Sequence, residues 1–151
     1  MTGTSEGHPV TDQTSSDAAR WREERRAAAA AHGELLAERQ RAESARAQEL
    51  FDAFLVRVTR SGPQPVELSA RSYDGRARYK TPLTGWYLRR DETVAIDTAG
   101  KFYVLTTPSS LAARFRGVTP EPSAPPLVIG AGGKDGESLD MSEALTRVLG
   151  R

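Results

Sequence analysis

The stretch that decides the fold is GWYLRRDETVAIDTAGKFYVLTT, residues 85–107. Aromatic and β-branched residues recur in three short runs, at 85–90, 93–96 and 101–107, as is typical of strands. The tetrapeptide DTAG, residues 97–100, predicts a hairpin loop. An aspartate there can accept hydrogen bonds from the following backbone, and the glycine supplies a positive φ. The stretch therefore predicts a three-stranded antiparallel meander.

The first of these strands places its side chains alternately on two faces. Trp86 and Leu88 share one face and are predicted to enter the core. Tyr87 and Arg89 fall on the other face and are predicted to be exposed; Tyr103 lies beside them if the third strand has the opposite-facing register.

Segments on either side of the meander complete a small domain. Residues 65–70 alternate as a strand does, whereas 71–85 contain Gly75, Pro82 and Gly85 and are predicted to form a loop. A short helix is expected after Thr107 as its N-cap, with Leu111 and Phe115 packed in the core and Gly117 at its end. A proline-rich connector covers 118–126, and a further strand is predicted at 127–130.

The last helix is predicted from a pattern of the capping-box type, Asp140 with Glu143, followed by apolar residues at helical spacing. Upstream, residues 17–61 have strong helix propensity, with Gly33 as a point of bending and Gly62–Pro63 as the stop. Only the end of this helix carries an apolar stripe, which predicts docking there.

The fold class is therefore α+β: a small antiparallel β-meander sheet with packed helices. We expect a disordered tail at 1–16, an Arg/Glu/Ala-rich helical arm at 17–49 and a compact domain at 50–151. The candidate core consists of large apolar side chains: Phe51, Phe54, Leu55, Val66, Leu68, Trp86, Leu88, Val94, Ile96, Phe102, Val104, Leu111, Phe115, Leu127, Ile129, Met141, Leu145 and Val148.

Composition removes several classes of chemistry. The chain has no cysteine, two histidines and a formal net charge of +1. The absence of cysteine excludes thiolate metal sites and cysteine nucleophiles, and two histidines leave little basis for a serine–histidine couple. We therefore expect no catalytic residue, metal or cofactor. The sequence carries no secretory signal and no apolar run of spanning length, so we expect a soluble cytoplasmic protein that does not bind a membrane.

Three regions are candidates for binding. Residues 71–90 interleave cations with aromatic rings, so Arg76, Arg78, Lys80, Tyr87 and Arg89 are candidate contacts with RNA, single-stranded nucleic acid or a protein partner. The alternative for the same residues is a structural role, since arginine also stacks on tyrosine within folded proteins.

The glycine-rich loop 130–136 is the second candidate, for a small anion or ligand. Neither phosphate-loop pattern is met: Asp135 follows Lys134 where a P-loop needs Ser or Thr, and it occupies the third glycine position of a dinucleotide fingerprint. A flexible connector explains this loop as well.

The helical arm is the third candidate, with Trp21 as an interface anchor, because an isolated tryptophan among polar residues is typical of protein contacts. The sequence as a whole favours a non-enzymatic accessory protein. It would bind a protein partner through the arm or through the exposed Tyr87/Arg89 face. The oligomeric state is left open.

Two segments also carry a resemblance. The core GWYLRRD…VAIDTAGKFYVLT followed by PPLVIGAGGKDGESLDM resembles a group of short uncharacterised proteins from GC-rich Gram-positive bacteria, over about residues 50–149. The resemblance implies a bacterial, cytoplasmic origin. It transfers no catalytic or binding residue, because no activity is established for that group.

Overall fold

The computed structural model describes residues 2–3, 10–130 and 138–151. The chain divides into two units, one up to Arg39 and one from Gln40 to Arg151. The first helix, α1 (Val10–Ser61), contributes residues to both units, which are described separately below.

In the first unit, α1 begins at Val10, before the predicted start at Asp17. α1 is continuous through Gly33, so the glycine does not break it; the cost of one helical glycine, about 1 kcal/mol, is small against a long run of good helix formers. In the second unit α1 ends where predicted, and the Gly62 N–H donates to the carbonyl of Val58 at 2.9 Å.

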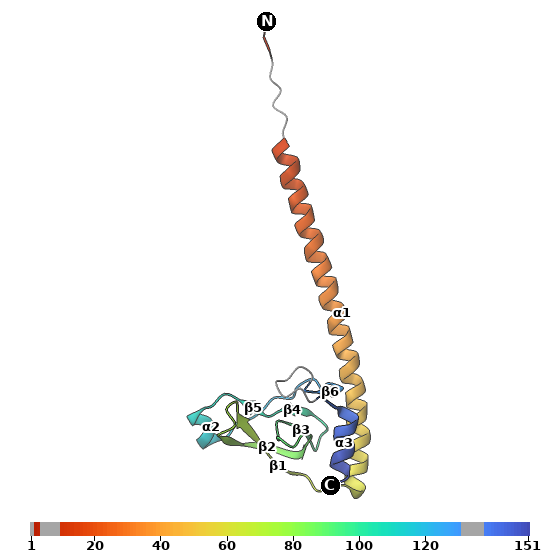
Figure 1. Cartoon of the computed structure of the whole chain (residues 1–151), viewed down its shortest axis with the longest axis vertical. Helices are drawn as coiled ribbons and strands as arrows, with labels where there is room; N and C mark the ends of the chain where they lie inside the picture. The colour runs from red at the N-terminus through yellow and green to blue at the C-terminus, as the bar shows by residue number, and fades with distance from the viewer. Residues whose placement is uncertain (1, 4–9, 131–137) are drawn as a thin grey trace. The chain divides into compact units, whose positions relative to one another are not determined.

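In its described residues the second unit contains seven strands and two further helices in a mixed α+β arrangement, shown in Figure 1. In chain order these are β1 (Val66–Ser72), β2 (Arg78–Tyr87), β3 (Val94–Asp97), β4 (Phe102–Val104), β5 (Thr106–Thr107), α2 (Leu111–Arg116), β6 (Val128–Ile129), β7 (Leu139–Asp140) and α3 (Met141–Leu149).

The larger sheet has the order β4-β3-β2-β1-β5 and closes on itself. All its pairings are antiparallel except β1 with β5, which is parallel. β4 and β5 are successive pieces of one chain segment that meet at Leu105. The Leu105 N–H donates to Thr93 at 2.7 Å and its carbonyl accepts from Arg71 at 2.7 Å. This segment thus joins β3 on one side to β1 on the other, and a ring results.

The predicted meander is confirmed as β2, β3 and β4, and the predicted loop at 71–85 is wrong over most of its length. β1 runs on to Ser72 and β2 begins at Arg78. The register between β1 and β2 shifts opposite Leu68, and Pro82 lies in that bulge, where a strand tolerates a residue without an N–H. Gly85 is needed because a Cβ there would meet the Ile96 carbonyl of β3.

The predicted hairpin loop at 97–100 is also confirmed. Asp97 Oδ1 accepts from the backbone N–H of Ala99 and of Lys101, both at 2.9 Å, and Gly100 has φ 83°. Asp97 Oδ2 accepts from the Tyr103 hydroxyl at 3.0 Å. Burial is the largest cause that raises the pKa of Tyr103 above its ordinary value, followed by this hydrogen bond and by the negative charge of Asp97.

Two apolar clusters fill the unit, one on each side of the sheet. The outer cluster joins the sheet to the end of α1 and to α3, and Trp86 and Leu88 lie in it as predicted. The inner cluster is made by Leu68, Ala95, Tyr103 and Leu105, with Tyr87 packed against it. The ring buries its inner side, so Tyr103 is buried and Tyr87 and Arg89 are half-buried, and the prediction that Tyr87 and Arg89 are exposed is wrong.

Both short helices are present, with different caps from those predicted. α2 begins after Ser110 and not after Thr107. α3 follows Asp140, whose side chain makes no capping hydrogen bond, so the expected reciprocal cap is absent. α3 buries Met141, Ala144, Leu145 and Val148, as its spacing predicts.

Four members of the predicted core are exposed. Val66 and Val104 are 49% and 46% exposed, Leu111 is 75% exposed and Phe115 is 86% exposed. The two valines lie on strands whose exposed faces a single valine commonly occupies. The two α2 residues are a larger departure, because they are adjacent on one helix.

Candidate functional site

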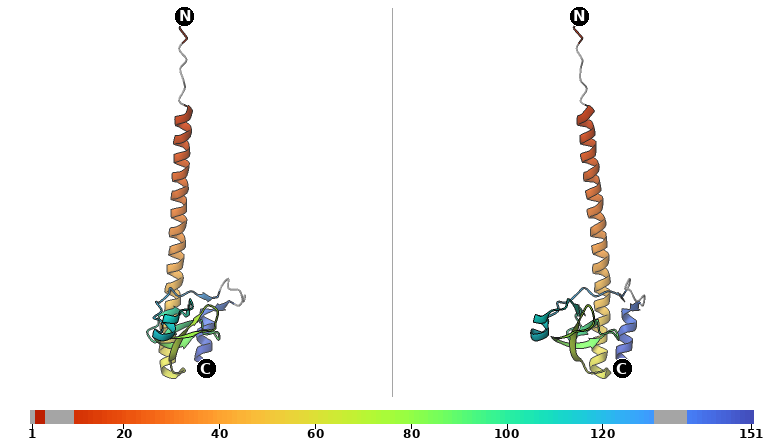
Figure 2. Two further views of the ribbon diagram at one scale, coloured as in Figure 1. Left: turned by 90° about the vertical axis from the view of Figure 1, so that its left-hand side faces the viewer. Right: turned by 60° about the vertical axis from the view of Figure 1, so that its left-hand side comes forward.

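The helix α2 follows β5 and lies at the opposite end of the sheet from α1 and α3, as Figures 1 and 2 show. Within the second unit it therefore receives no cover from either of those helices. Its position makes it the natural place to look for a binding surface.

Hydrogen bonds hold α2 to β2 at both ends. At its start the Ser110 N–H donates to the hydroxyl of buried Tyr79 at 3.0 Å, and the Ser110 hydroxyl accepts from the Ala113 N–H at 3.2 Å. Past its end the Val118 N–H donates to the carbonyl of Lys80 at 2.8 Å. The helix is thus fixed in place.

Gly117 permits the close approach at this second attachment. It has φ 73° and ψ −172°, a region open essentially to glycine alone. A Cβ at this position would stand 2.5 Å from the Lys80 carbonyl oxygen. Any other residue would therefore push the end of α2 away from β2.

The solvent side of α2 carries a pair of large apolar residues. Leu111 and Phe115 are one helical turn apart, on the same face, and are the most exposed large apolar side chains among the described residues. An exposed pair of this kind on a fixed helix is unusual, since single scattered apolar residues are what ordinary surfaces show.

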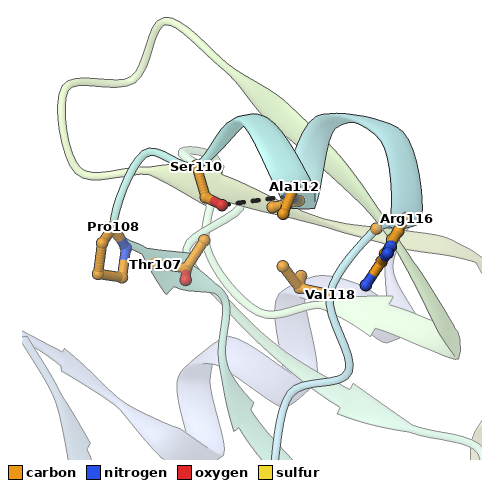
Figure 3. A pocket seen from close by; sticks show the side chains of 8 residues that line it. Thr107, Pro108, Ser110, Ala112, Arg116 and Val118 are labelled. Atoms are coloured by element: carbon orange, nitrogen blue, oxygen red, sulfur yellow. Dashed lines mark hydrogen bonds between the residues drawn. The ribbon is translucent and has the colours of Figure 1, made fainter.

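A shallow hollow of about 390 Å³ lies beside this face. Figure 3 shows Thr107 and Pro108 on one side of it, Arg116 on the other and Val118 between them. Ala112, Ala113, Ser110 and Gly117 complete the lining. This size is near the lower end for ligand pockets and suits one or two anchoring side chains.

The chain segment that carries α2 has charge of one sign. No Asp or Glu occurs between Thr98 and Pro120, whereas Arg114 and Arg116 lie on the helix. Among the described residues neither arginine has a carboxylate within ion-pair distance. We call Leu111, Arg114, Phe115, Arg116 and the hollow the α2 surface.

The predicted contacts of residues 71–90 do not gather on one free face. Arg78 is engaged by Glu92 at 2.6 Å, and the same carboxylate also holds Arg71 at 3.3 Å. Arg89 is half-buried, with its Nε 3.6 Å from Asp91.

The remaining three positions are separated as well. The Tyr87 ring packs against the inner cluster and its hydroxyl accepts from the Ser69 N–H at 2.8 Å, so the ring is not a free stacking platform. Arg76 lies exposed in the turn after β1, where its N–H donates to Asp74. Lys80 is exposed on β2 and is next to the end of α2.

Trp21 lies in the first unit and is 58% exposed. The guanidinium of Arg25, one turn later, is 4.7 Å from the ring centroid. One face of the ring is thus occupied by a cation–π contact within its own helix.

Of the glycine loop 130–136, only Gly130 is described, with φ 75° at the end of β6. The rest of that candidate ligand site lies outside the described residues.

The described ranges 2–3, 10–130 and 138–151 contain no group of three or more acidic, histidine or cysteine side chains placed to hold a metal ion. In the same ranges no helix has both the length and the apolar character needed to cross a membrane.

No family model, curated protein sequence or solved structure matches this chain. The resemblance to the Gram-positive group therefore stays a prediction.

Sequence reasoning missed the α2 surface because it assigned Leu111 and Phe115 to the core. A signal was nevertheless present: residues 98–120 contain no acidic residue, and Arg114 and Arg116 flank Phe115.

Proposed function

We propose that this protein acts by binding a protein partner through the α2 surface, and not by catalysis. The observation that carries the proposal is the exposure of Leu111 and Phe115, 75% and 86%, on a helix held at both ends. Fixed apolar anchors lose little conformational freedom on binding, which favours association.

Both residue types match what protein interfaces select. Aromatic residues and arginine are enriched at interface centres, and α2 presents Phe115 between Arg114 and Arg116. The helix is also tied to Tyr79, so the surface is organised before any partner arrives.

This proposal places the binding face on α2 and not on the Tyr87/Arg89 face that the sequence predicted. The Tyr87/Arg89 face is half-buried and is engaged within the chain, so it supports neither protein binding nor nucleic-acid binding as well as the α2 surface does.

The test compares three full-length chains: wild type, the double variant Leu111→Asp/Phe115→Asp, and the matched control Val56→Asp, which alters another exposed apolar residue, 55% exposed. Each is used for affinity capture from lysate of the source cells, with quantitative mass spectrometry. We expect at least one protein that wild type and the control retain and that the double variant loses.

Unfolding of all three chains is measured first, and equal stability is expected because every substituted side chain is exposed. Identical captured sets for the three chains, or no specific capture by any, would contradict the proposal.

A further inference from the structure

We infer that the α2 surface recognises an acidic chain segment in which Asp or Glu lies directly beside apolar anchor residues. This inference rests on the proposed function and names the chemical class of the partner. It follows from how the surface can be approached, from its shape and from its charge.

Recognition here has to use side chains. The α2 surface consists of helical side chains and a hollow and contains no strand edge of the larger sheet on which a partner strand could pair through its backbone. A partner must therefore seat side chains on α2 and in the hollow.

The shape calls for a small number of anchors. Leu111 and Phe115 form one apolar ridge, and the hollow beside it takes one or two further side chains. Leucine, phenylalanine or tryptophan on the partner would fill this space.

The positive charge of the α2 surface favours acidic residues beside the apolar anchors of the partner. Arg116 lines the hollow itself and Arg114 flanks Phe115, so a carboxylate next to an anchor would meet a guanidinium. Lys80 lies close by: a Cβ built on Gly117 would stand 3.6 Å from the Cβ of Lys80. Arginine pairs with carboxylates in a two-pronged geometry, which adds direction to the attraction.

Two other anionic surfaces fit less well. A six-residue helix with two large apolar residues offers little area for insertion into a lipid surface. Single-stranded nucleic acid needs several stacking rings, whereas Tyr79 is buried and Leu111 has no ring.

The experiment uses a display library of short random peptides selected on the full-length chain, with counter-selection on the full-length Leu111→Asp/Phe115→Asp chain. We expect the enriched peptides to carry Asp or Glu within two positions of Leu, Phe or Trp. Their affinity should fall with added salt, because exposed charge pairs are screened.

A charge swap then sharpens the result. In the variant Arg114→Glu/Arg116→Glu the selected acidic peptides should bind at least about ten-fold more weakly, and analogues with Lys in place of Asp or Glu should bind better than they do to wild type. The control Arg57→Glu changes an exposed arginine of α1 and should leave both affinities unchanged.

Enrichment of peptides without an acidic excess, or equal binding of acidic peptides to the charge-swapped chain, would overturn the inference. So would sedimentation with phosphatidylserine vesicles or a mobility shift with poly-uridine that depends on Phe115 while no acidic peptide binds.

Failure of the inference and failure of the proposed function are distinguishable. A captured protein that needs Leu111 and Phe115 but binds through a neutral or basic segment keeps the function and overturns the inference. Absence of any α2-dependent partner overturns both.

Discussion

The two short helices of the second unit, α2 and α3, follow similar sequence patterns and end in opposite environments. Each places apolar residues one turn apart, with arginine in its last turn. α3 buries Met141, Ala144, Leu145 and Val148 against α1 and the sheet. α2 buries only Ala113 and leaves Leu111 and Phe115 in solvent.

The difference teaches that helical periodicity identifies a face that is apolar, and not what covers it. For α3 the cover comes from the same chain. For α2 nothing in the described part of the chain covers the larger side chains. The apolar face of α3 therefore serves folding, and we propose that the apolar face of α2 serves binding.

The largest expected effect is a difference in stability between alanine substitutions at Leu145 of α3 and Leu111 of α2. Leu145→Ala removes a side chain that is 5% exposed and should destabilise the fold by about 2–5 kcal/mol. Leu111→Ala, at 75% exposure, should change the free energy of unfolding by about 0.5 kcal/mol or less. Urea denaturation measures both. Similar losses for the two variants would mean that α2 belongs to the core.

A second comparison uses the glycines that end the helices. Gly117→Ala forces a residue into φ 73° against the Lys80 carbonyl and should cost about 1–3 kcal/mol. Gly150→Ala meets nothing closer than 3.7 Å at φ −87° and should be neutral within about 0.5 kcal/mol. Thermal unfolding distinguishes them. A harmless Gly117→Ala would show that the attachment of α2 to β2 is unimportant.

The caps give a smaller effect. Ser110→Ala removes a hydroxyl that accepts from Ala113 N–H and should weaken α2 by about 1 kcal/mol. Asp140→Ala removes no capping hydrogen bond and should affect α3 by less than Ser110→Ala affects α2. Amide hydrogen exchange within each helix reports the loss. The reverse order would show that Asp140 supports α3 electrostatically more than Ser110 supports α2.

The free energy of unfolding is expected to depend on pH in the alkaline range, through Tyr103. Because burial raises the pKa of Tyr103 above its ordinary value of about 10, the unfolded chain loses this proton first as pH rises. Stability from this group is therefore complete below about pH 10 and declines above it. Unfolding of wild type and Tyr103→Phe across this range checks the sign: the decline should be shallower in the variant.

Local patterns predicted much of the fold. The period-2 face of Trp86 and Leu88, the Asp97–Gly100 loop and the apolar face of α3 were all found from neighbours in the sequence. Closure of the sheet was not predicted, because β5 has two residues and its partners Arg71 and Ser72 are distant in the sequence. A two-residue strand carries no period to detect.

The candidate site was predicted less well, for a related reason. Whether a side chain such as Tyr87 or Phe115 is covered depends on tertiary neighbours that no local window contains. Tyr87 is partly covered because the ring of strands encloses the inner cluster. Phe115 is exposed because α2 lies far from α3, at the other end of the sheet.

The meeting of β4 and β5 at Leu105 also affects how the domain folds during synthesis. During synthesis β1, β2 and β3 leave the ribosome before Thr106 and Thr107, so the outer edge of β1 waits unpaired until those last two residues arrive. An unpaired edge can pair with another nascent chain. Completion of the ring by two threonines therefore ends the period in which this domain is most prone to assemble wrongly.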